Sequence, residues 1–277
     1  MTNWETLQPP APEGGWPPDR KTFWPWWLCA PPLFAAIGLM AKTVVIGGER
    51  IPATGPVIIA SNHVSVIDPT YLIRAFWKQG RLARFLAKAS IWKVPFIGAM
   101  MRASGQVPVD RRGGAAASLQ AAEHLIETGS MVVVYPEGTL TRDPKLWPMR
   151  GKTGAARIAL ESGVPILPVA HWGAQQILPP YGRLRPFPRR TFTLLVGEPL
   201  DLTPWQGRAG DSRALAEVTD AIMDAITALQ AQLRDEQPPE HRWDMAVDGD
   251  PYHRDERTKS GSRAAAQRRA AKRKARG

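Results

Sequence analysis

Cysteine is almost absent from this 277-residue sequence, in which Cys29 is the only one. An internal disulfide therefore cannot form, and a metal site built from several thiolates is excluded. The five histidines and the carboxylates never cluster at the spacing of metal ligands, so we expect no bound metal. The single cysteine suits a reducing compartment, and the sequence contains no internal repeat.

Acidic residues are missing from residues 263–277, which contain seven arginines and lysines. The whole chain has a net charge of +11, so this tail leaves +4 for the rest. A block of like charges is typical of a solvated chain end. It could also hold to anionic lipid or to the phosphates of a nucleic acid.

Charge is missing as well from residues 23–41, an apolar run that opens with a cluster of tryptophans. Tryptophan favours the headgroup level of a bilayer, and the run is close to the roughly 20 residues that span one. Three prolines would interrupt a single straight helix: Pro25, Pro31 and Pro32. We therefore expect residues 21–46 to associate with the membrane as a broken or interfacial segment. A secretory signal is disfavoured because the apolar run is too long and comes too late, and a buried core helix because the tryptophans cluster.

Beyond residue 44, short β-branched and apolar runs alternate with longer amphipathic ones. The short runs predict strands at 57–60, 84–88, 106–109, 131–135, 165–170 and 191–196. The longer runs predict helices at 69–78, 90–102, 114–128, 153–162 and 211–233. Such alternation predicts an α/β fold, with a mixed, mostly parallel sheet covered by helices on both faces. Ligands of these sheets collect beyond the carboxyl ends of the strands.

These patterns divide the chain into four parts. We expect a disordered, proline-rich N-terminus, a membrane-associating segment, an α/β domain and a disordered basic tail, over residues 1–20, 21–46, 47–234 and 235–277.

His63 and Asp68 lie directly after the predicted strand 57–60. An imidazole titrates near neutrality and can take a proton from a hydroxyl, provided that a carboxylate fixes its tautomer. Residues five apart are rotated by roughly 140° on a regular helix, but Pro69 favours a helix that begins there. Residues 61–68 then form a turn that can fold His63 back onto Asp68. The alternative is that Asp68 only caps the helix.

Three more segments follow predicted strands. Arg111 and Arg112 close one strand, and the planar guanidinium group suits phosphate oxygens. The segment 135–142 contains Glu137 and Gly138, and its glycine allows close backbone approach to a ligand. The run 164–170 is mostly apolar and is typical of a buried strand. Taken singly, these residues could equally be surface charges, a simple turn and core.

Together and in this order, the four segments closely resemble the conserved blocks of the glycerolipid acyltransferases, the family that contains 1-acylglycerol-3-phosphate acyltransferase. The resemblance covers about residues 40–200. The family's first block, an Asn-His-x-Ser run followed by an aspartate, is filled by Asn62, His63, Ser65 and Asp68. The second block ends in an arginine, here Arg111. The third and fourth correspond to Tyr135, Pro136, Glu137, Gly138 and Thr139, and to residues 164–169.

The resemblance implies transfer of a fatty acyl group from coenzyme A or acyl carrier protein to the free hydroxyl of a lysophospholipid, above all 1-acylglycerol-3-phosphate, giving phosphatidic acid. It implies that His63 is the general base and that Asp68 orients it, without a covalent acyl-enzyme.

No cofactor is expected beyond the acyl thioester. The partners are then the membrane lipid surface and the two substrates, with no specific nucleic acid, and the location is the cytoplasmic face of the plasma membrane. The expected substrate-binding residues are Asn62, Ser65, Arg111, Glu137, Gly138, Thr139, Arg142 and Lys152.

The sequence departs from the family at one position, where Leu140 stands in place of the arginine that usually follows the threonine. A leucine cannot pair with phosphate. Arg142 could take its place, or Lys152, which lies among glycines before a predicted helix and so suits an anion. This departure leaves open another lysolipid acceptor, or water, which would make the protein a thioesterase.

A non-catalytic alternative is a lipid- or nucleic-acid-binding protein whose basic tail is the functional part, but the intact pair of His63 and Asp68 disfavours it. Among the other histidines, His171 follows a strand and is interpreted as a packed residue beside Trp172. The rest carry no site signal: His124, His241 and His253.

Overall fold

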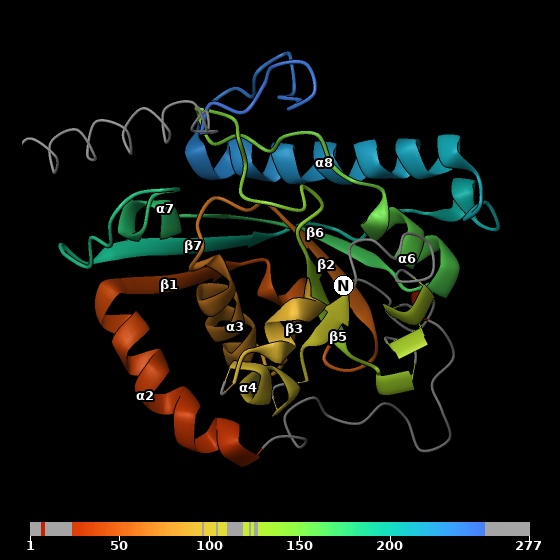
Figure 1. Ribbon diagram of the computed structural model, residues 1–277. Helices are drawn as coiled ribbons and strands as arrows, with labels where there is room; N and C mark the ends of the chain where they lie inside the picture. The colour runs from red at the N-terminus through yellow and green to blue at the C-terminus, as the bar shows by residue number, and fades with distance from the viewer. Residues whose placement is uncertain are drawn as a thin grey trace, which may run out of the picture.

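The computed structural model describes residues 7–8, 24–95, 97–103, 105–109, 119–121, 123–124 and 127–252. Within these residues, seven strands form one sheet in the order β1-β7-β6-β2-β5-β3-β4 (Figure 1). The strands are β1 (Ala41–Ile46), β2 (Val57–Ser61), β3 (Ala83–Lys88), β4 (Val107–Val109), β5 (Met131–Val134), β6 (Ile166–Trp172) and β7 (Arg190–Val196). The α-helices are α2 (Trp24–Met40), α3 (Asp68–Lys78), α4 (Ile97–Ala103), α6 (Gly154–Ser162), α7 (Ala174–Ile177) and α8 (Ser212–Arg234). Short 3₁₀ turns cover Gly48–Arg50, Ala89–Lys93 and Thr203–Trp205.

The sheet is mixed and mostly parallel, as the alternation of elements predicts. Strands β6, β2, β5, β3 and β4 pair in parallel, whereas β7 runs antiparallel to β6 and pairs in parallel with β1. Because β2, β5 and β6 are adjacent and run the same way, their carboxyl ends meet at one edge of the sheet.

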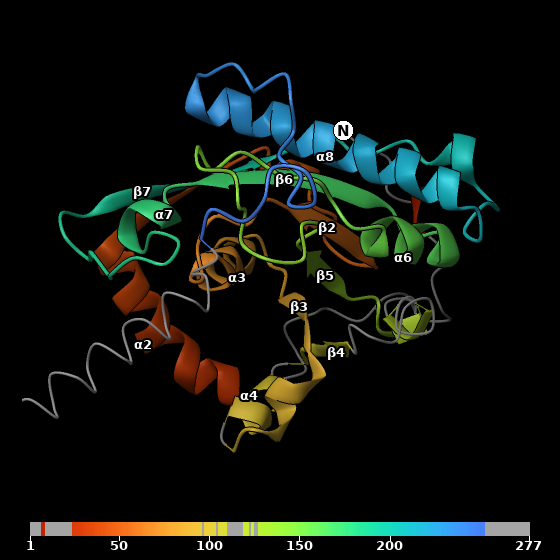
Figure 2. The ribbon, with the colours of Figure 1, turned by 45° about the horizontal axis from the view of Figure 1, so that its top comes forward.

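Helices cover both faces of the sheet, and the pleat of β2 shows why. Val57 and Ile59 point into one core cluster, together with residues of α3. Ile58 and Ala60 point into the other, together with residues of α6 and α8. Successive side chains of a strand alternate between faces, so a fully buried strand such as β2 serves both cores. The long helix α8 crosses one face, and α3 lies on the opposite face (Figures 1 and 2).

Proline sets two of the element boundaries. The helix predicted at 69–78 begins one residue earlier, at Asp68, with Pro69 in its first turn. The helix predicted at 90–102 is instead a 3₁₀ turn followed by α4. Pro95 lies between the two, where its ring and missing N–H end a helix. Most of the helix predicted at 114–128 lies outside the described residues.

The N-terminal apolar run differs from the prediction in two ways. Helix α2 continues through Pro31 and Pro32 rather than breaking there. Residues 41–46, which we assigned to the membrane-associating segment, are strand β1 and pair with β7 from Ala41 to Ile46. None of the helices that the structure describes combines the length and the apolar character needed to cross a membrane.

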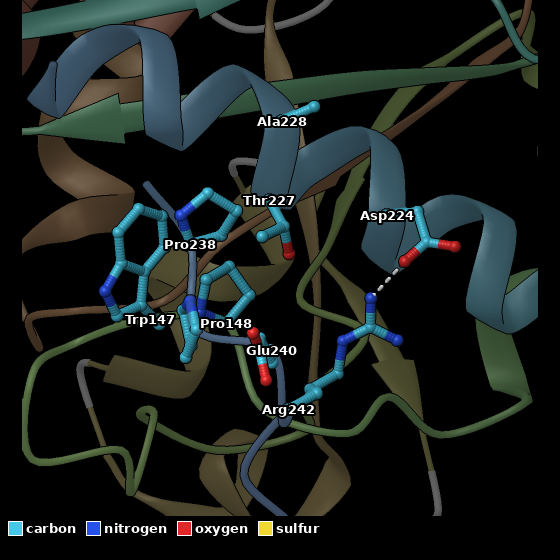
Figure 3. Close-up of a pocket in the computed structure, with 9 residues that line it drawn as sticks. Trp147, Pro148, Asp224, Thr227, Ala228, Pro238, Glu240 and Arg242 are labelled. Carbon is cyan, nitrogen blue, oxygen red and sulfur yellow. Dashed lines mark hydrogen bonds and ion pairs between the residues drawn. The ribbon is translucent and has the colours of Figure 1, made fainter. Parts of the chain in front are cut away.

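The chain is not disordered directly after α8, which corrects the predicted boundary at residue 235. The backbone N–H of Arg150 donates to the carbonyl of Trp243 at 2.8 Å, and Arg242 pairs with Asp224 on α8 at 2.5 Å. Residues 236–252 therefore fold back over α8 and the segment that follows β5. A cavity of about 250 Å³ lies between them, lined in part by Trp147, Pro148, Asp224, Pro238, Glu240 and Arg242 (Figure 3). Charged residues in this segment, whose number suggested disorder, instead form ion pairs with residues far away in the sequence.

Ending the chain at Asp235 should lower the melting temperature, whereas ending it at Tyr252 should not. The shorter chain loses the contacts of Trp243 and Arg242 and exposes Trp147, which is 3% exposed in the full structure. A loss of 1 kcal/mol lowers the melting temperature by about 2–4 °C in a domain of this size. Thermal unfolding of the two truncated proteins measures the difference, and equal melting temperatures would contradict the packing described.

Candidate active site

Three polar residues gather where the carboxyl ends of the central strands meet. His63 follows β2, Glu137 follows β5, and His171 is the second-to-last residue of β6. Because β2 is hydrogen-bonded to both β5 and β6, the sheet itself places these residues side by side. This is the edge at which ligands bind in open α/β sheets.

The carboxylate of Asp68 organises the turn between β2 and α3. Its Oδ2 atom accepts hydrogen bonds from the backbone N–H groups of Val64 at 2.8 Å and Ser65 at 2.7 Å. The same oxygen lies 3.0 Å from Nδ1 of His63. Asp68 is fully buried, so these donors offset the cost of removing its charge from water. The donors precede Asp68 in the chain, so the side chain ties the turn together rather than capping α3.

His63 is held by contacts on its edge and on one face of its ring. Nδ1 faces Asp68, and the ring stacks on Tyr135 with centroids 3.9 Å apart and planes 11° apart. The side chain is 16% exposed, and Nε2 has no hydrogen bond to a described residue. An Nδ1–H that donates to the carboxylate leaves Nε2 as a proton acceptor. The arrangement can therefore remove a proton from a hydroxyl placed beside Nε2.

Glu137 connects the segment after β5 to the His63 turn. Its two carboxylate oxygens accept hydrogen bonds from the backbone N–H groups of His63 and Met149, both at 3.1 Å. Burial raises the pKa of the Glu137 carboxyl from 4.5 to about 8, although these two hydrogen bonds favour the charged form. In addition, the backbone N–H of Thr141 donates to the carbonyl of His63 at 2.8 Å. Glu137 is buried, and each of its oxygens is hydrogen-bonded to protein backbone.

Gly138 and Lys152 lie together beside that turn. Gly138 has a φ of 72°, a conformation that favours glycine. A Cβ there would lie 3.1 Å from Nζ of Lys152, so the lysine passes directly over the glycine backbone. The backbone N–H of Lys152 donates to the carbonyl of Pro136 at 2.8 Å, which fixes this approach. Lys152 is exposed and Thr139 half-buried, so both can meet a ligand.

Arg142 turns toward the C-terminal segment. Its guanidinium group lies 5.0 Å from the ring centroid of Tyr181 and 3.6 Å from the carboxylate of Asp250. Leu140, at the position where the family carries arginine, is buried. The second predicted phosphate ligand, Arg111, lies outside the described residues.

Asn62 and Ser65 are buried and serve the protein rather than an open site. The amide of Asn62 exchanges two hydrogen bonds with the backbone of His171, at 3.0 and 2.9 Å. The hydroxyl of Ser65 donates to the carbonyl of Leu178 at 2.6 Å. Both residues were expected to contact substrate, but their polar groups are committed to holding the turn in place. They therefore position His63.

His171 is fully buried next to Asp68. Its Nε2 is 2.9 Å from the carbonyl oxygen of Asn62 and 3.6 Å from Oδ2 of Asp68. Burial lowers the pKa of His171, against the opposing effect of Asp68, and so favours the neutral ring. The residue is packed in the core, and it also supports the turn that carries His63.

Sequence reasoning did not identify Tyr135 as a site residue, although it falls within the third block. The signal was present, because an aromatic residue directly after β5 lies opposite the residues that follow β2. Burial raises the pKa of the Tyr135 hydroxyl well above its ordinary value, so the side chain offers His63 a neutral ring.

Comparison with known proteins finds related sequences and a similar solved structure. Residues 42–172 match the family described as Acyltransferase. The chain is 33% identical to the chloroplastic 1-acyl-sn-glycerol-3-phosphate acyltransferase BAT2 of Brassica napus over 152 residues, which are 53% of this chain and 42% of that protein. It is 27% identical to the 1-acyl-sn-glycerol-3-phosphate acyltransferase of Bacillus subtilis over 206 residues, which are 74% of this chain and 97% of that one.

A crystal structure is also similar, that of the 1-acyl-sn-glycerophosphate acyltransferase PlsC of Thermotoga maritima. It superposes with a TM-score of 0.53 at 26% identity, covering 74% of this chain and 78% of that one. The chain spans about half or less of the plant, algal and Borreliella relatives that it matches.

Glu137→Gln should flatten the dependence of stability on pH. The raised pKa means that the folded state holds a proton that the unfolded state has lost between pH 4.5 and about 8. The wild-type protein should therefore lose stability as the pH rises through this window, by at most about 1.4 kcal/mol per pH unit. A glutamine cannot ionise, so the variant should lack this slope.

Urea unfolding between pH 5 and pH 9 measures the slopes. Glu217→Gln is the matched control, because hydrogen bonds lower the pKa of this half-buried residue and its effect lies at acid pH. Parallel curves for wild type and Glu137→Gln would show that the buried carboxyl does not titrate in this range.

Proposed function

Because residues 42–172 match the Acyltransferase family, we propose that this protein transfers a fatty acyl group from an acyl thioester to the free hydroxyl of 1-acylglycerol-3-phosphate. The product is phosphatidic acid. The pairing of His63 with the buried Asp68 at 3.0 Å carries this proposal, because it supplies a base for the hydroxyl. Relatives named 1-acyl-sn-glycerol-3-phosphate acyltransferase support the choice of acceptor.

The reaction follows from the geometry around His63. Nε2 takes the proton of the acceptor hydroxyl while the oxygen attacks the thioester carbonyl carbon, and Asp68 stabilises the imidazolium that forms. The tetrahedral intermediate then collapses, the carbon–sulfur bond breaks, and the imidazolium returns the proton to the leaving thiolate. The products are an ester and a free thiol of coenzyme A or acyl carrier protein. No covalent acyl-enzyme forms, because the acceptor oxygen attacks directly.

Lys152 is the described residue best placed to bind the acceptor phosphate. It is exposed, it crosses Gly138 on the segment that Glu137 ties to His63, and its ammonium group can form charge-assisted hydrogen bonds. Thr139 contributes a hydroxyl from the same segment, and we propose Arg111 as a second cation from the family resemblance. Asn62, Ser65 and Glu137 act by positioning.

A second candidate is transfer to a different lysolipid. Leu140 is buried where the family carries arginine, and Arg142 is engaged with Tyr181 and Asp250. An acceptor that needs fewer cations around its headgroup would fit such a site. In either case we propose that the enzyme works at the cytoplasmic face of the plasma membrane, with α2 in contact with lipid.

His63→Ala should abolish acyl transfer. A general base contributes roughly 10²- to 10⁴-fold to a reaction rate, so thiol release from acyl-coenzyme A with lysophosphatidate should fall at least 100-fold. His241→Ala is the matched control, because that histidine is exposed and pairs only with Asp248 among described residues. Circular dichroism checks the fold of both variants.

Omitting the lysophosphatidate separates a transferase from a thioesterase, because a transferase releases little thiol without its acceptor. Thiol release that does not depend on the acceptor, or a fully active His63→Ala protein, would refute the proposed function.

Lys152→Ala should raise KM for lysophosphatidate and leave KM for the acyl thioester unchanged. Loss of a charge-assisted hydrogen bond costs about 1.5–3 kcal/mol, so kcat/KM for the acceptor should fall roughly 10- to 100-fold. Lys145→Ala is the control, since this exposed lysine lies in the same segment and forms hydrogen bonds with described residues only through its own backbone N–H and carbonyl. Equal acceptor kinetics in the two variants would exclude Lys152 from the phosphate site.

A further inference from the structure

We infer that residues 181–189, which connect α7 to β7 and which we term the arginine loop, dock onto anionic lipid beside the active site. This inference deepens the proposed function and rests on it, because an enzyme that acylates a lysolipid needs its site at a lipid surface. It assigns that contact to a particular surface, separate from the N-terminal helix and from the basic C-terminal tail.

The sequence of the arginine loop combines positive charge with large apolar side chains. It contains Arg183, Arg185 and Arg189, with Leu184 and Phe187 between them. No acidic residue occurs between Glu161 and Glu198, so nothing nearby in the chain neutralises this charge. Basic side chains that alternate with Leu and Phe are typical of segments that lie in the interface of an anionic membrane.

The structure leaves both kinds of side chain in the open. Phe187 is 75% exposed and Leu184 is 54% exposed, although each could bury a large apolar area. The three arginines are exposed and form no ion pair with a described residue. Large apolar side chains that stay exposed beside unpaired charges of one sign indicate a surface that something else covers.

Two backbone hydrogen bonds and one ring contact fix the base of the arginine loop. The backbone N–H of Arg185 donates to the carbonyl of Ile177 at 2.6 Å, and that of Gly182 donates to Pro179 at 3.0 Å. Tyr181 stacks on Tyr252 with ring centroids 4.7 Å apart. The base of the loop is therefore fixed while its arginines and Phe187 project.

The loop adjoins helix α2, which offers a second apolar surface. The residue after the loop, Arg190, is paired with Ala41, directly after the last residue of α2. Leu39, near that end of α2, is 69% exposed. Figures 1 and 2 both show the loop between α7 and β7 at the left edge of the molecule, close to the point where α2 meets β1.

The N-terminal end of the arginine loop lies next to the active site. The carbonyl of Leu178, just before the loop, accepts the hydrogen bond of the Ser65 hydroxyl. Ser65 in turn donates its backbone N–H to Asp68, and Tyr181 lies under Arg142. Hydrogen bonds thus connect the start of the arginine loop to the turn that carries His63. A bilayer in contact with the loop would lie next to the site at which a lysolipid must arrive.

Lipid fits this surface better than nucleic acid or an acidic protein. Phosphate headgroups complement the three arginines, and the acyl region just beneath them accepts Phe187 and Leu184, which a purely polar partner would leave exposed. Each basic residue near an anionic membrane strengthens binding by roughly fivefold. Three arginines should therefore account for on the order of 100-fold in affinity.

A fluorescent label at position 187 tests the contact in the full chain. The labelled protein is Phe187→Cys in a Cys29→Ser background, carrying an environment-sensitive fluorophore. A matched label at Arg213→Cys replaces an exposed side chain near the start of α8. With vesicles of phosphatidylglycerol, the emission at 187 should shift to the blue and that at 213 should not. If the protein sediments with these vesicles while the label at 187 stays unchanged, another part of the chain makes the contact and the inference is wrong.

Charge removal gives the second measurement. The triple variant Arg183→Gln, Arg185→Gln and Arg189→Gln should bind phosphatidylglycerol vesicles on the order of 100-fold more weakly than wild type. The control removes three exposed cations elsewhere: Lys145→Gln, Arg208→Gln and Arg213→Gln. Because both variants keep the basic tail, the difference between them reports on the loop. Equal affinities would overturn the inference, as would a label at 187 that responds to RNA but not to vesicles.

Turnover on soluble, short-chain substrates separates this inference from the proposed function. The loop variant should keep wild-type turnover there, because its arginines do not contact the pair of His63 and Asp68. If the wild-type protein has no transferase activity but the label at 187 enters the bilayer, the proposed function fails and the lipid surface stands. If transfer occurs and the label stays in water, the reverse holds.

Discussion

A single buried oxygen atom, Oδ2 of Asp68, keeps the turn after β2 in its working shape. Two backbone N–H groups donate to it, and the imidazole of His63 lies 3.0 Å away. A carboxylate buried without such donors would be very costly, so the turn cannot relax without losing them. The chemistry that we propose for His63 therefore depends on backbone geometry as much as on the histidine itself, because that geometry fixes the ring nitrogen that faces Asp68.

Other buried polar residues extend this constraint outward. Glu137 accepts from the backbone of His63, and Asn62 exchanges hydrogen bonds with His171. Strands β5 and β6 are thereby connected to the turn that follows β2, and Lys152 is carried on the segment that Glu137 anchors. The sheet, the proposed base and the proposed phosphate ligand form one connected unit, so a phosphate bound at Lys152 would lie in a fixed relation to His63.

How much of the site the sequence predicts depends on how far apart the interacting residues lie along the chain. The pairing of His63 with Asp68 was predictable because both lie in one short turn and Pro69 fixes where the helix begins. Glu137 was interpreted as a substrate ligand because an acidic residue in a turn gives no sign that its partners, His63 and Met149, are backbone groups far away in the chain. For the same reason, the sequence did not predict strand β1 or the fold of residues 236–252. Strand β1 is held by pairing with β7. Residues 236–252 are held in part by the ion pairs of Arg242 with Asp220 and Asp224.

The protonation state of the His63 ring is the most direct test of this account. Nitrogen-15 NMR of the histidine side chains distinguishes an imidazole protonated at Nδ1 from one protonated at Nε2. The account predicts that neutral His63 carries its proton on Nδ1, facing Asp68, and that Asp68→Asn loses this preference. A proton found on Nε2 of the wild-type ring, or the same tautomer in both proteins, would contradict the role of Asp68 and leave His63 without a free nitrogen to act as the base.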